Sequence, residues 1–426
     1  MSLKDELTRL SKEELIDVIV QLVANQERIE AKLRQYVNPH TPSSQVRFKP
    51  NTKKENVNED KPRFPGRPEG HEGAGIRLPR PDQVVEHKIA NKGFVCIGKR
   101  TRTIIDFVDK PIIVTKHVIY QYRSPDGELV EAPNDLPEGT YGKNLQAFLT
   151  LVRGVSGTSH EKLSRIITSL RPDLTLCAAT SQALTDKIAQ NLEHRKNRLM
   201  HEIRAAPYVN ADETGLRQDG VNGYTWVFCT PTKALYEVDL SRGRGVPERV
   251  LGPDYAGIVV RDGWNAYDNY RSQRCWVHLE RELDALAEDN PELLVQSVHL
   301  KEIHKRAKGA KKLSRLQRQH AISVLNSNVE LGHVLNVLRA TRSARKFATK
   351  LTNARPFLFT GVEHPEVPLD NNHGERTVRP IVIHRKMMGC IRNHKGERFI
   401  ENVMSMMQTW HMQDRDVYKQ LQHYAR

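Results

Sequence analysis

Three acidic residues in separate parts of the chain could together bind divalent metal ions. Asp212 ends a short apolar run that begins at Tyr208, and Asp262 follows a second run at residues 257–260. Both runs are typical of buried strands, and ligands of open α/β sheets usually bind at the ends of such strands. Glu375 lies in a third acidic stretch. Three carboxylates brought together by folding suit two divalent ions, which activate a nucleophile and stabilise a leaving oxygen in phosphoryl transfer.

The stretch around Glu375 predicts a turn that leads into a short helix. Asp370 is a favourable N-cap residue, and Pro380 is expected to end the helix. Asn371, Glu375 and Arg379 recur every four residues and would share one face of this helix. An acid between an amide and a guanidinium suits a metal held beside a phosphate, although a solvated helix with an ordinary ion pair would have the same pattern.

Further motifs accompany the three acids and follow one another along the chain. They are Asp212-Glu213-Thr214, then Arg261-Asp262-Gly263-Trp264 with Tyr267, then Cys275-Trp276-Val277-His278-Leu279-Glu280-Arg281, then Asp370-Asn371-Asn372 with Glu375-Arg376, Arg379-Pro380 and Arg385-Lys386. Together these motifs resemble the insertion-sequence-66 family of DDE transposases. The resemblance covers roughly residues 130–426 and continues more weakly toward the N-terminus.

The resemblance implies a DNA transposase of a bacterial or archaeal insertion sequence. It implies an α/β fold with a ribonuclease-H-like catalytic core, which is a mixed five-stranded sheet with flanking helices. Asp212, Asp262 and Glu375 would form the catalytic triad and bind two Mg²⁺ or Mn²⁺ ions. The expected partner is double-stranded DNA, both as the terminal inverted repeats of the element and as the target. The sequence leaves open whether accessory proteins from the same element are needed.

Several other side chains are expected near the triad. The Cys275-x-x-His278 spacing offers only two of the four ligands of a structural zinc site, so no zinc is expected. His278 would either hydrogen-bond the scissile phosphate or be a satisfied structural histidine. Glu213 is expected in a supporting position, because neighbouring strand residues point to opposite faces. Arg379 and Lys386 are candidate phosphate clamps, because their charges neutralise phosphate oxygens. The full set of expected DNA contacts is His278, Arg281, Asn371, Arg376, Arg379 and Lys386.

The composition favours a polyanionic partner and a reducing compartment. The 426 residues carry a formal net charge of +15, which favours nucleic acid, although a ribosome- or membrane-binding protein would share this charge. The five cysteines have no paired spacing, so neither a disulfide framework nor a zinc ribbon is expected. The sequence has no apolar run of membrane-spanning length and no basic leader. A soluble, cytoplasmic, nucleoid-associated protein is therefore expected.

The catalytic core is expected to follow several smaller regions. Leucine and isoleucine at near-helical spacing at the N-terminus favour a coiled coil, and thus a homo-oligomer, over a helix packed on its own domain. Relatives often carry a zinc segment where this chain keeps only Cys96, so the β module there is expected to lack zinc. The expected ranges are 1–38 for the coiled-coil helix, 39–82 for a basic disordered linker, 83–132 for the β module, 133–205 for a helical region compatible with a helix-turn-helix, 206–412 for the core with a helical insertion at about 283–355, and 413–426 for a C-terminal helix.

Local patterns within these regions predict individual elements. Residues 224–230 and 234–238 predict an antiparallel strand pair. Arg242 and Arg244 lie in a loop that would either grip phosphates or be solvated. Residues 181–187 would begin a recognition helix if the preceding helical region reads DNA rather than simply packing beside the core.

Two other functions fit the same residues. A nuclease with the same fold would use three acids, but it would not need the helical insertion or the basic N-terminal arm. A catalytically inactive DNA-binding regulator would not need three intact acids. Joining of a labelled 3′ end to target DNA would separate a transposase from a nuclease, and metal titration would identify a regulator.

Overall fold

A computed structural model gives the fold and describes residues 111–123, 125, 129–131 and 139–425. The expected coiled-coil helix at 1–38, the linker at 39–82 and most of the β module at 83–132 lie outside these residues. Within that module, β1 (Gln121–Arg123) pairs antiparallel with β2 (Leu129–Glu131). None of the described helices is long and apolar enough to cross a lipid bilayer.

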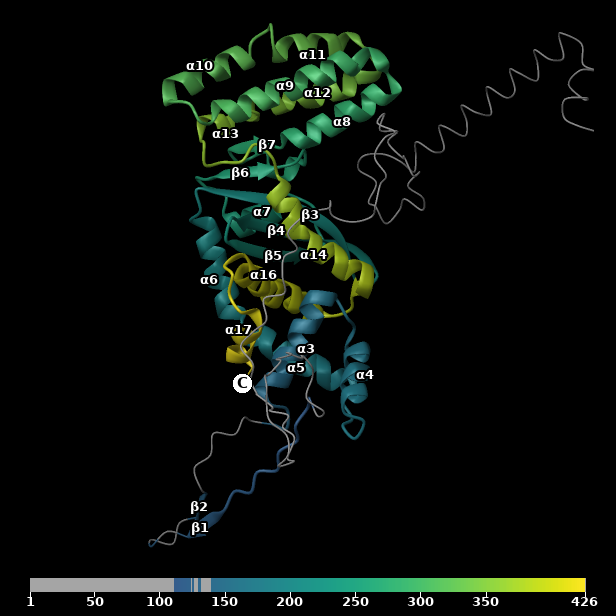
Figure 1. Ribbon diagram of the computed structural model, residues 1–426, viewed down its shortest axis with the longest axis vertical. Coiled ribbons are helices and arrows are strands. Elements are labelled where there is room, and N and C mark those ends of the chain that lie inside the picture. Colours follow the sequence, from purple (N-terminus) through teal and green to yellow (C-terminus); the bar gives the residue numbers. More distant parts are fainter. Residues whose placement is uncertain (1–110, 124, 126–128, 132–138, 426) are drawn as a thin grey trace, which may run out of the picture. The chain divides into compact units, whose positions relative to one another are not determined.

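A mixed sheet with strands in the order β5-β4-β3-β6-β7 forms the centre of the folded region (Figure 1). The strands are β3 (Tyr208–Gln218), β4 (Val221–Thr230), β5 (Lys233–Asp239), β6 (Ile258–Arg261) and β7 (Ser272–Arg274). β4 is antiparallel to β3 and β5, as predicted for its pairing with β5, whereas β6 is parallel to β3 and β7. The short β8 (Cys390–Ile391) pairs with the end of β3. Five strands in this order are compatible with the predicted ribonuclease-H-like core.

Helices that precede the strands in the sequence and helices that follow them pack on the sheet and share its hydrophobic core. Trp226, Phe228 and Tyr236 of the sheet are fully buried in one cluster with Met407 and Trp410. Residues from the C-terminal part of the chain thus complete the core of the sheet. The helices in this core are α3 (Lys143–Ser156), α5 (Ala178–Asn191), α6 (Glu193–Arg204), α7 (Gly245–Leu251), α14 (Asn372–Met388), α16 (Ser405–Met412) and α17 (Val417–Tyr424). Helix α4 (His160–Leu170) packs on α3 and α5 in a separate small cluster, and the short α15 (His394–Arg398) has no buried residue.

Residues 181–187, which would begin the expected recognition helix, lie inside α5 and are partly used for packing. Ser181, Thr185 and Asp186 are buried. The Ser181 hydroxyl lies 3.1 Å from His160 Nδ1, and Arg398 donates to Asp186 at 2.8 Å. These contacts attach α5 to its neighbours, so this face of the helix is not available to a DNA groove.

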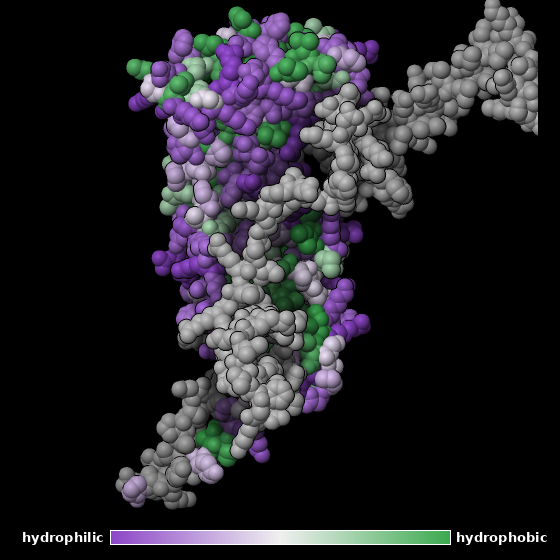
Figure 2. All heavy atoms as spheres, viewed as in Figure 1, coloured by the Kyte–Doolittle hydropathy of each residue, from purple (hydrophilic) through white to green (hydrophobic). Residues whose placement is uncertain are grey.

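The helices between β7 and α14 form a unit with its own core. They are α8 (Trp276–Asp289), α9 (Leu294–Ala310), α10 (Arg315–Leu325), α11 (Leu331–Ala340), α12 (Arg345–Ala354) and α13 (Thr360–Glu363). The insertion expected at about 283–355 lies within this stretch. Leu283, Leu300, Leu335 and Phe347 belong to one buried cluster that is separate from the core of the sheet. The face of these helices that Figure 2 shows is mostly hydrophilic, with scattered hydrophobic patches; Leu294, Leu316 and Val329 are among the exposed apolar residues of this unit.

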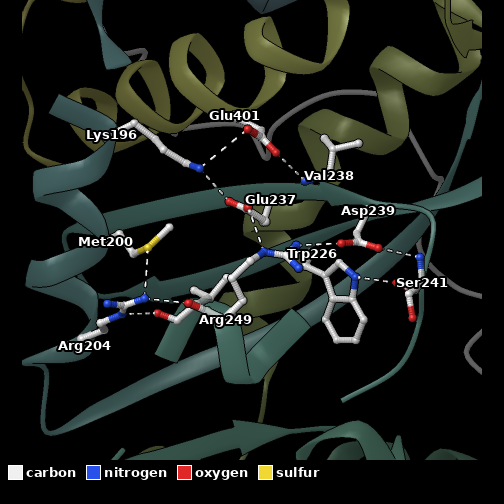
Figure 3. A network of polar contacts seen from close by, with 11 residues as sticks. Lys196, Met200, Arg204, Trp226, Glu237, Val238, Asp239, Ser241, Arg249 and Glu401 are labelled. Atoms are coloured by element: carbon white, nitrogen blue, oxygen red, sulfur yellow. Dashed lines mark hydrogen bonds and ion pairs between the residues drawn. The ribbon is translucent and has the colours of Figure 1, made fainter. Parts of the chain in front are cut away.

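A network of ion pairs fixes the elements that pack around the edge strand β5 (Figure 3). Lys196 Nζ lies 2.8 Å from Glu237 Oε2 and 3.6 Å from Glu401 Oε2. Arg249 lies 2.7 Å from Asp239 Oδ2 and 3.6 Å from Glu237 Oε1. Burial, together with the charge of Glu237, raises the pKa of Glu401 to about 7. Because these residues come from α6, α7, β5 and the π-helical turn Phe399–Met404, the network joins four elements.

Helix α14 continues through Pro380, so the prediction that Pro380 ends the helix is wrong. A proline lacks the N–H that would bond the carbonyl four residues earlier, and it usually breaks a helix that stands alone. Here both halves of the helix are attached to the sheet. The Tyr236 hydroxyl donates to Thr377 O at 2.6 Å, and Arg385 Nη1 donates to Gly215 O at 2.7 Å. These tertiary contacts stabilise the helix across the position where one backbone hydrogen bond is missing.

Candidate active site

The fold brings Asp212, Asp262 and Glu375 together. Asp212 lies in β3, Asp262 directly follows β6, and Glu375 is in the first turn of α14. In the parallel pairing of β3 with β6, Asn210 lies opposite Val260, and continuing this register by two residues puts Asp212 beside Asp262. Burial raises the pKa of Asp212 well above its usual range, and the charges of Asp262, Glu213 and Glu375 raise it further. The four carboxylates therefore interact electrostatically.

Asn371 positions the Glu375 helix against the Asp212 strand. Its side-chain Oδ1 accepts from Asn210 Nδ2 at 2.9 Å, and its Nδ2 donates to Ala211 O at 2.8 Å. Asn371 is completely buried, so the prediction that it contacts DNA is wrong. The helix can come this close because residue 374 is glycine: a Cβ there would lie only 2.7 Å from Asn371 Oδ1.

The basic residues of α14 differ in how far they lie from the acids. Arg376, Arg379 and Lys386 are exposed. Arg379 is one turn from Glu375, a rise of about 6 Å, whereas Lys386 lies about 16 Å along the helix axis. Arg379 therefore lies close to the acidic site along the helix, whereas Lys386 lies well away from it. Arg385, in contrast, is attached to β3 and takes no part in this exposed face.

Both carboxylate oxygens of Glu213 accept hydrogen bonds from other side chains of the protein. Its side chain is only 2% exposed, and Arg242 Nη2 lies 2.7 Å from Oε1. The fully buried Tyr267 donates its hydroxyl to Oε2 at 2.9 Å. Burial and the charge of Asp262 raise the pKa of Glu213, while the hydrogen bonds from Arg242 and Tyr267 lower it. Glu213 is thus held by the fold beside the three other acids.

Arg242 links Glu213 to the loop that carries Asp262. Its guanidinium carbon lies 4.0 Å from the centre of the Trp264 ring, and Trp264 Nε1 donates to Arg242 O at 2.8 Å. The backbone N–H of Trp264 donates to Asp262 Oδ1 at 2.8 Å. Arg242 is therefore neither a solvated loop residue nor a free phosphate grip, and nothing in the linear spacing of the sequence indicated this link. Arg244, two residues later, is exposed.

His278 and Arg281 lie beside Glu375, near the start of α8. His278 Nε2 is 3.5 Å from Glu375 Oε1, and Arg281 Nη1 is 3.7 Å from Oε2. Cys275, His278 and Glu375 each offer one ligand atom within 4.8 Å of the others. The sequence motif contained only the first two residues of this set, and α14 supplies the third. Burial raises the pKa of the Cys275 thiol to about 11, which keeps it protonated at neutral pH.

The acidic cluster has the donor chemistry for hard divalent cations. Its donors are carboxylate oxygens, the ligands that Mg²⁺ and Mn²⁺ prefer. Glu375 Oε1 is buried and has no hydrogen-bond partner among the described residues. Repulsion between Asp212 and its acidic neighbours disfavours the fully ionised cluster unless a cation compensates it. Asp212, Asp262 and Glu375 thus fit the metal ligands expected from the sequence.

Asp212→Asn is expected to stabilise the metal-free protein at neutral pH. A carboxyl group whose pKa is raised in the folded state stabilises the fold fully below its unfolded pKa of about 4. This contribution to the free energy of unfolding is lost as the pH rises through the folded pKa. Asparagine resembles the protonated acid at every pH. In EDTA, the melting temperature of the variant should therefore exceed that of wild type by roughly 2–4 °C at pH 7, equivalent to about 1 kcal/mol, with a smaller difference at pH 4.

The melting temperatures of wild type and Asp212→Asn should also be measured with added Mg²⁺. Mg²⁺ should raise the melting temperature of wild type more than that of Asp212→Asn, because it relieves repulsion that the variant lacks. Asp254→Asn is the matched control, since Asp254 is exposed. Equal melting temperatures of the Asp212 variant and wild type at both pH values would contradict the raised pKa.

A comparison with protein families agrees with the resemblance seen in the sequence. The model of the family described as "Transposase IS66 family" matches residues 138–398. This range contains all three acids, Arg242 and the helices between β7 and α14. No curated protein gives a significant match to the chain. The family model covers more than half of the chain, which therefore belongs to the IS66 family of transposases.

Proposed function

We propose that the protein catalyses metal-dependent DNA transposition, by cleaving the ends of its element and joining them to target DNA. The observation that carries this proposal is the gathering of Asp212, Asp262 and Glu375 from β3, β6 and α14 in a member of a transposase family. The strand order supports a ribonuclease-H-like core. Three convergent carboxylates are the arrangement that two-metal phosphoryl transfer requires.

In this mechanism the triad holds the cations and the neighbouring residues orient DNA. Bound Mg²⁺ or Mn²⁺ ions would supply activation of the attacking hydroxyl and stabilisation of the leaving 3′-oxygen. Asp212 and Asp262 approach from the sheet, and Glu375 approaches from α14. His278 and Arg281, which lie beside the Glu375 carboxylate, would hydrogen-bond a phosphate oxygen. Arg379, one turn along α14, can neutralise a second one.

The same proposal includes the DNA substrate, the oligomeric state and the location of the protein in the cell. The substrate is double-stranded DNA at the terminal inverted repeats and at the target, and the net charge of +15 favours its binding. We propose that the protein acts as a homo-oligomer, in the cytoplasm at the nucleoid. Whether accessory proteins of the element take part is decided by adding them to the assay below.

The test is a strand-transfer reaction with labelled DNA of the element end, a target plasmid and Mg²⁺. We expect the labelled 3′ end to become covalently joined to the plasmid. Cleavage without joining would replace this function with that of a nuclease. DNA binding with neither reaction, also with accessory proteins present, would indicate a regulator.

Arg242→Ala is expected to slow cleavage roughly 10- to 100-fold without weakening DNA binding. The substitution leaves the buried Glu213 carboxylate without its ion-pair partner and removes the stacking partner of Trp264, so the Asp262 loop shifts. Cleavage rate and DNA affinity should be measured separately. Arg244→Ala serves as the control, because Arg244 is exposed in the same loop, and it should cleave within about 2-fold of wild type. A loss of DNA affinity in Arg242→Ala alone would instead make Arg242 a phosphate contact.

A further inference from the structure

A cavity of about 580 Å³ lies between the loop that follows β6 and helix α12. Gly263 and Asn265 of the Asp262 loop line one side, and Lys346, Lys350 and Phe357 line the other. Arg261 and Arg274 also border it. Its volume falls within the range of roughly 300–1,000 Å³ that is usual for small-molecule sites. The cavity thus joins the catalytic sheet to the inserted helices.

Arg274 is a buried cation without a carboxylate ion-pair partner in the part of the chain that the structure describes. It is 6% exposed and donates through Nη1 to the backbone carbonyl of Asp262, but it forms no ion pair among the described residues. Burial and the nearby charge of Arg261 lower its pKa to about 10, while the charges of Asp262 and Asp268 raise it in part; Arg274 therefore stays charged at neutral pH. A buried charge without a partner is costly, so such a group is expected to meet an anion when the site is filled.

The other cations at the cavity show why Arg274 is distinctive. Arg261 donates to Asp268 Oδ1 at 2.8 Å, to Trp264 O and to Ser272 Oγ, so each of its three guanidinium nitrogens already makes a hydrogen bond within the protein. Lys350 pairs with Glu282. Lys346, in contrast, is exposed and forms no ion pair among the described residues. Two positive charges, one deep and one at the rim, are therefore available to a ligand.

The shape of the cavity limits which anion can enter. The phosphates of an intact duplex lie on a convex surface and cannot reach a buried guanidinium in a concave site. A single unstacked nucleotide can, because it offers a phosphate to the two cations and a flat base to the Phe357 ring and the amides of Asn265 and Asn353. Gly263 packs directly against this guanidinium, since a Cβ there would lie 3.0 Å from Arg274 Nη2.

We propose that this cavity binds one unpaired nucleotide of the DNA substrate, next to the loop that carries Asp262. The proposal rests on the proposed function, because the nucleotide would come from the strand being processed. A free nucleotide offers the same phosphate and base, so the experiment must distinguish the two sources. The proposed ligand is a nucleotide within a DNA strand.

The test compares the affinity of the metal-free protein for two labelled duplexes, one blunt and one with three unpaired nucleotides at a 3′ end. Wild type should bind the tailed duplex at least about 5-fold more tightly. Lys346→Glu and Arg274→Gln should reduce that ratio to about 1. Lys308→Glu is the matched control: Lys308 is also exposed on the inserted helices and lies outside the cavity, so the variant should keep the ratio.

Different results of this experiment would contradict the cavity proposal, the DNA source of the nucleotide or the proposed function. Equal ratios in wild type, Lys346→Glu and Lys308→Glu would overturn the proposal, and this holds even if Arg274→Gln fails to fold. A binding defect for deoxyadenosine monophosphate in the two cavity variants, with unchanged ratios for DNA, would overturn the DNA source and leave a free-nucleotide site. Because the assay needs no cleavage, a normal ratio pattern in a protein that fails to join DNA would count against the proposed function alone.

Discussion

Asp262→Asn is expected to lower both cleavage and joining of element-end DNA by about 10³-fold or more. The side chain lies where β6 delivers it beside Asp212, and its Oδ1 is oriented by the Trp264 N–H. Asparagine keeps the size and that hydrogen bond but removes the negative charge that a divalent cation needs. The bound cations stabilise the transition state, and the substitution loses several kcal/mol of this stabilisation. At about 1.4 kcal/mol for each tenfold change in rate, this loss corresponds to a decrease of about 10³-fold.

The reaction should be measured as labelled product formed in Mg²⁺, together with DNA affinity from a gel-shift titration. Affinity should remain within about 3-fold of wild type, because removing an acid from a basic protein does not weaken its contacts with phosphates. Asp254→Asn, the same change at an exposed position, should leave both measurements unchanged. Strand cleavage by Asp262→Asn at the wild-type rate would refute the assignment of the site.

The convergence of the two aspartates followed from the sequence because it depends on local patterns. An apolar run predicts a buried strand, and an acid at its end predicts a carboxylate at the edge of a sheet. Two such runs placed in parallel necessarily bring Asp212 and Asp262 to the same edge. The antiparallel β4–β5 pair was predictable for the same reason, since a short turn joins its strands.

The partners of these acids could not be predicted, because they depend on contacts between distant segments. Helical spacing correctly placed Asn371 and Glu375 near each other, but it could not show that Asn371 faces the sheet and is completely buried. The link from Glu213 through Arg242 to Trp264 likewise joins three separate loops and strands. Pro380 was misinterpreted for a related reason: local propensity favours a helix end, and only tertiary contacts outweigh it.

Asn371→Ala is expected to destabilise the fold by roughly 2–4 kcal/mol and to slow cleavage about 10- to 100-fold in the protein that remains folded. The substitution removes two buried hydrogen bonds, so Asn210 Nδ2 and Ala211 O each lose the partner that Asn371 provides, at a cost of about 1–3 kcal/mol for a buried group left unsatisfied. The same bonds fix the distance between the strand of Asp212 and the helix of Glu375. A displacement of about 1 Å in a catalytic group can cost 10²-fold in rate.

Urea denaturation would measure the first effect, and cleavage at a temperature well below the transition would measure the second. Asn372→Ala is the matched control, since the neighbouring side chain is only half-buried and should cost less than about 1 kcal/mol. Asn371→Asp provides a further distinction: it keeps an acceptor for Asn210 but loses the donor to Ala211 O, and it adds a fifth carboxylate near Glu375. It should therefore be no more active than Asn371→Ala, and its stability deficit should shrink as pH falls and the new acid becomes protonated. If Asn371→Ala and Asn372→Ala unfolded at the same urea concentration, Asn371 would not be the residue that holds the two catalytic elements together.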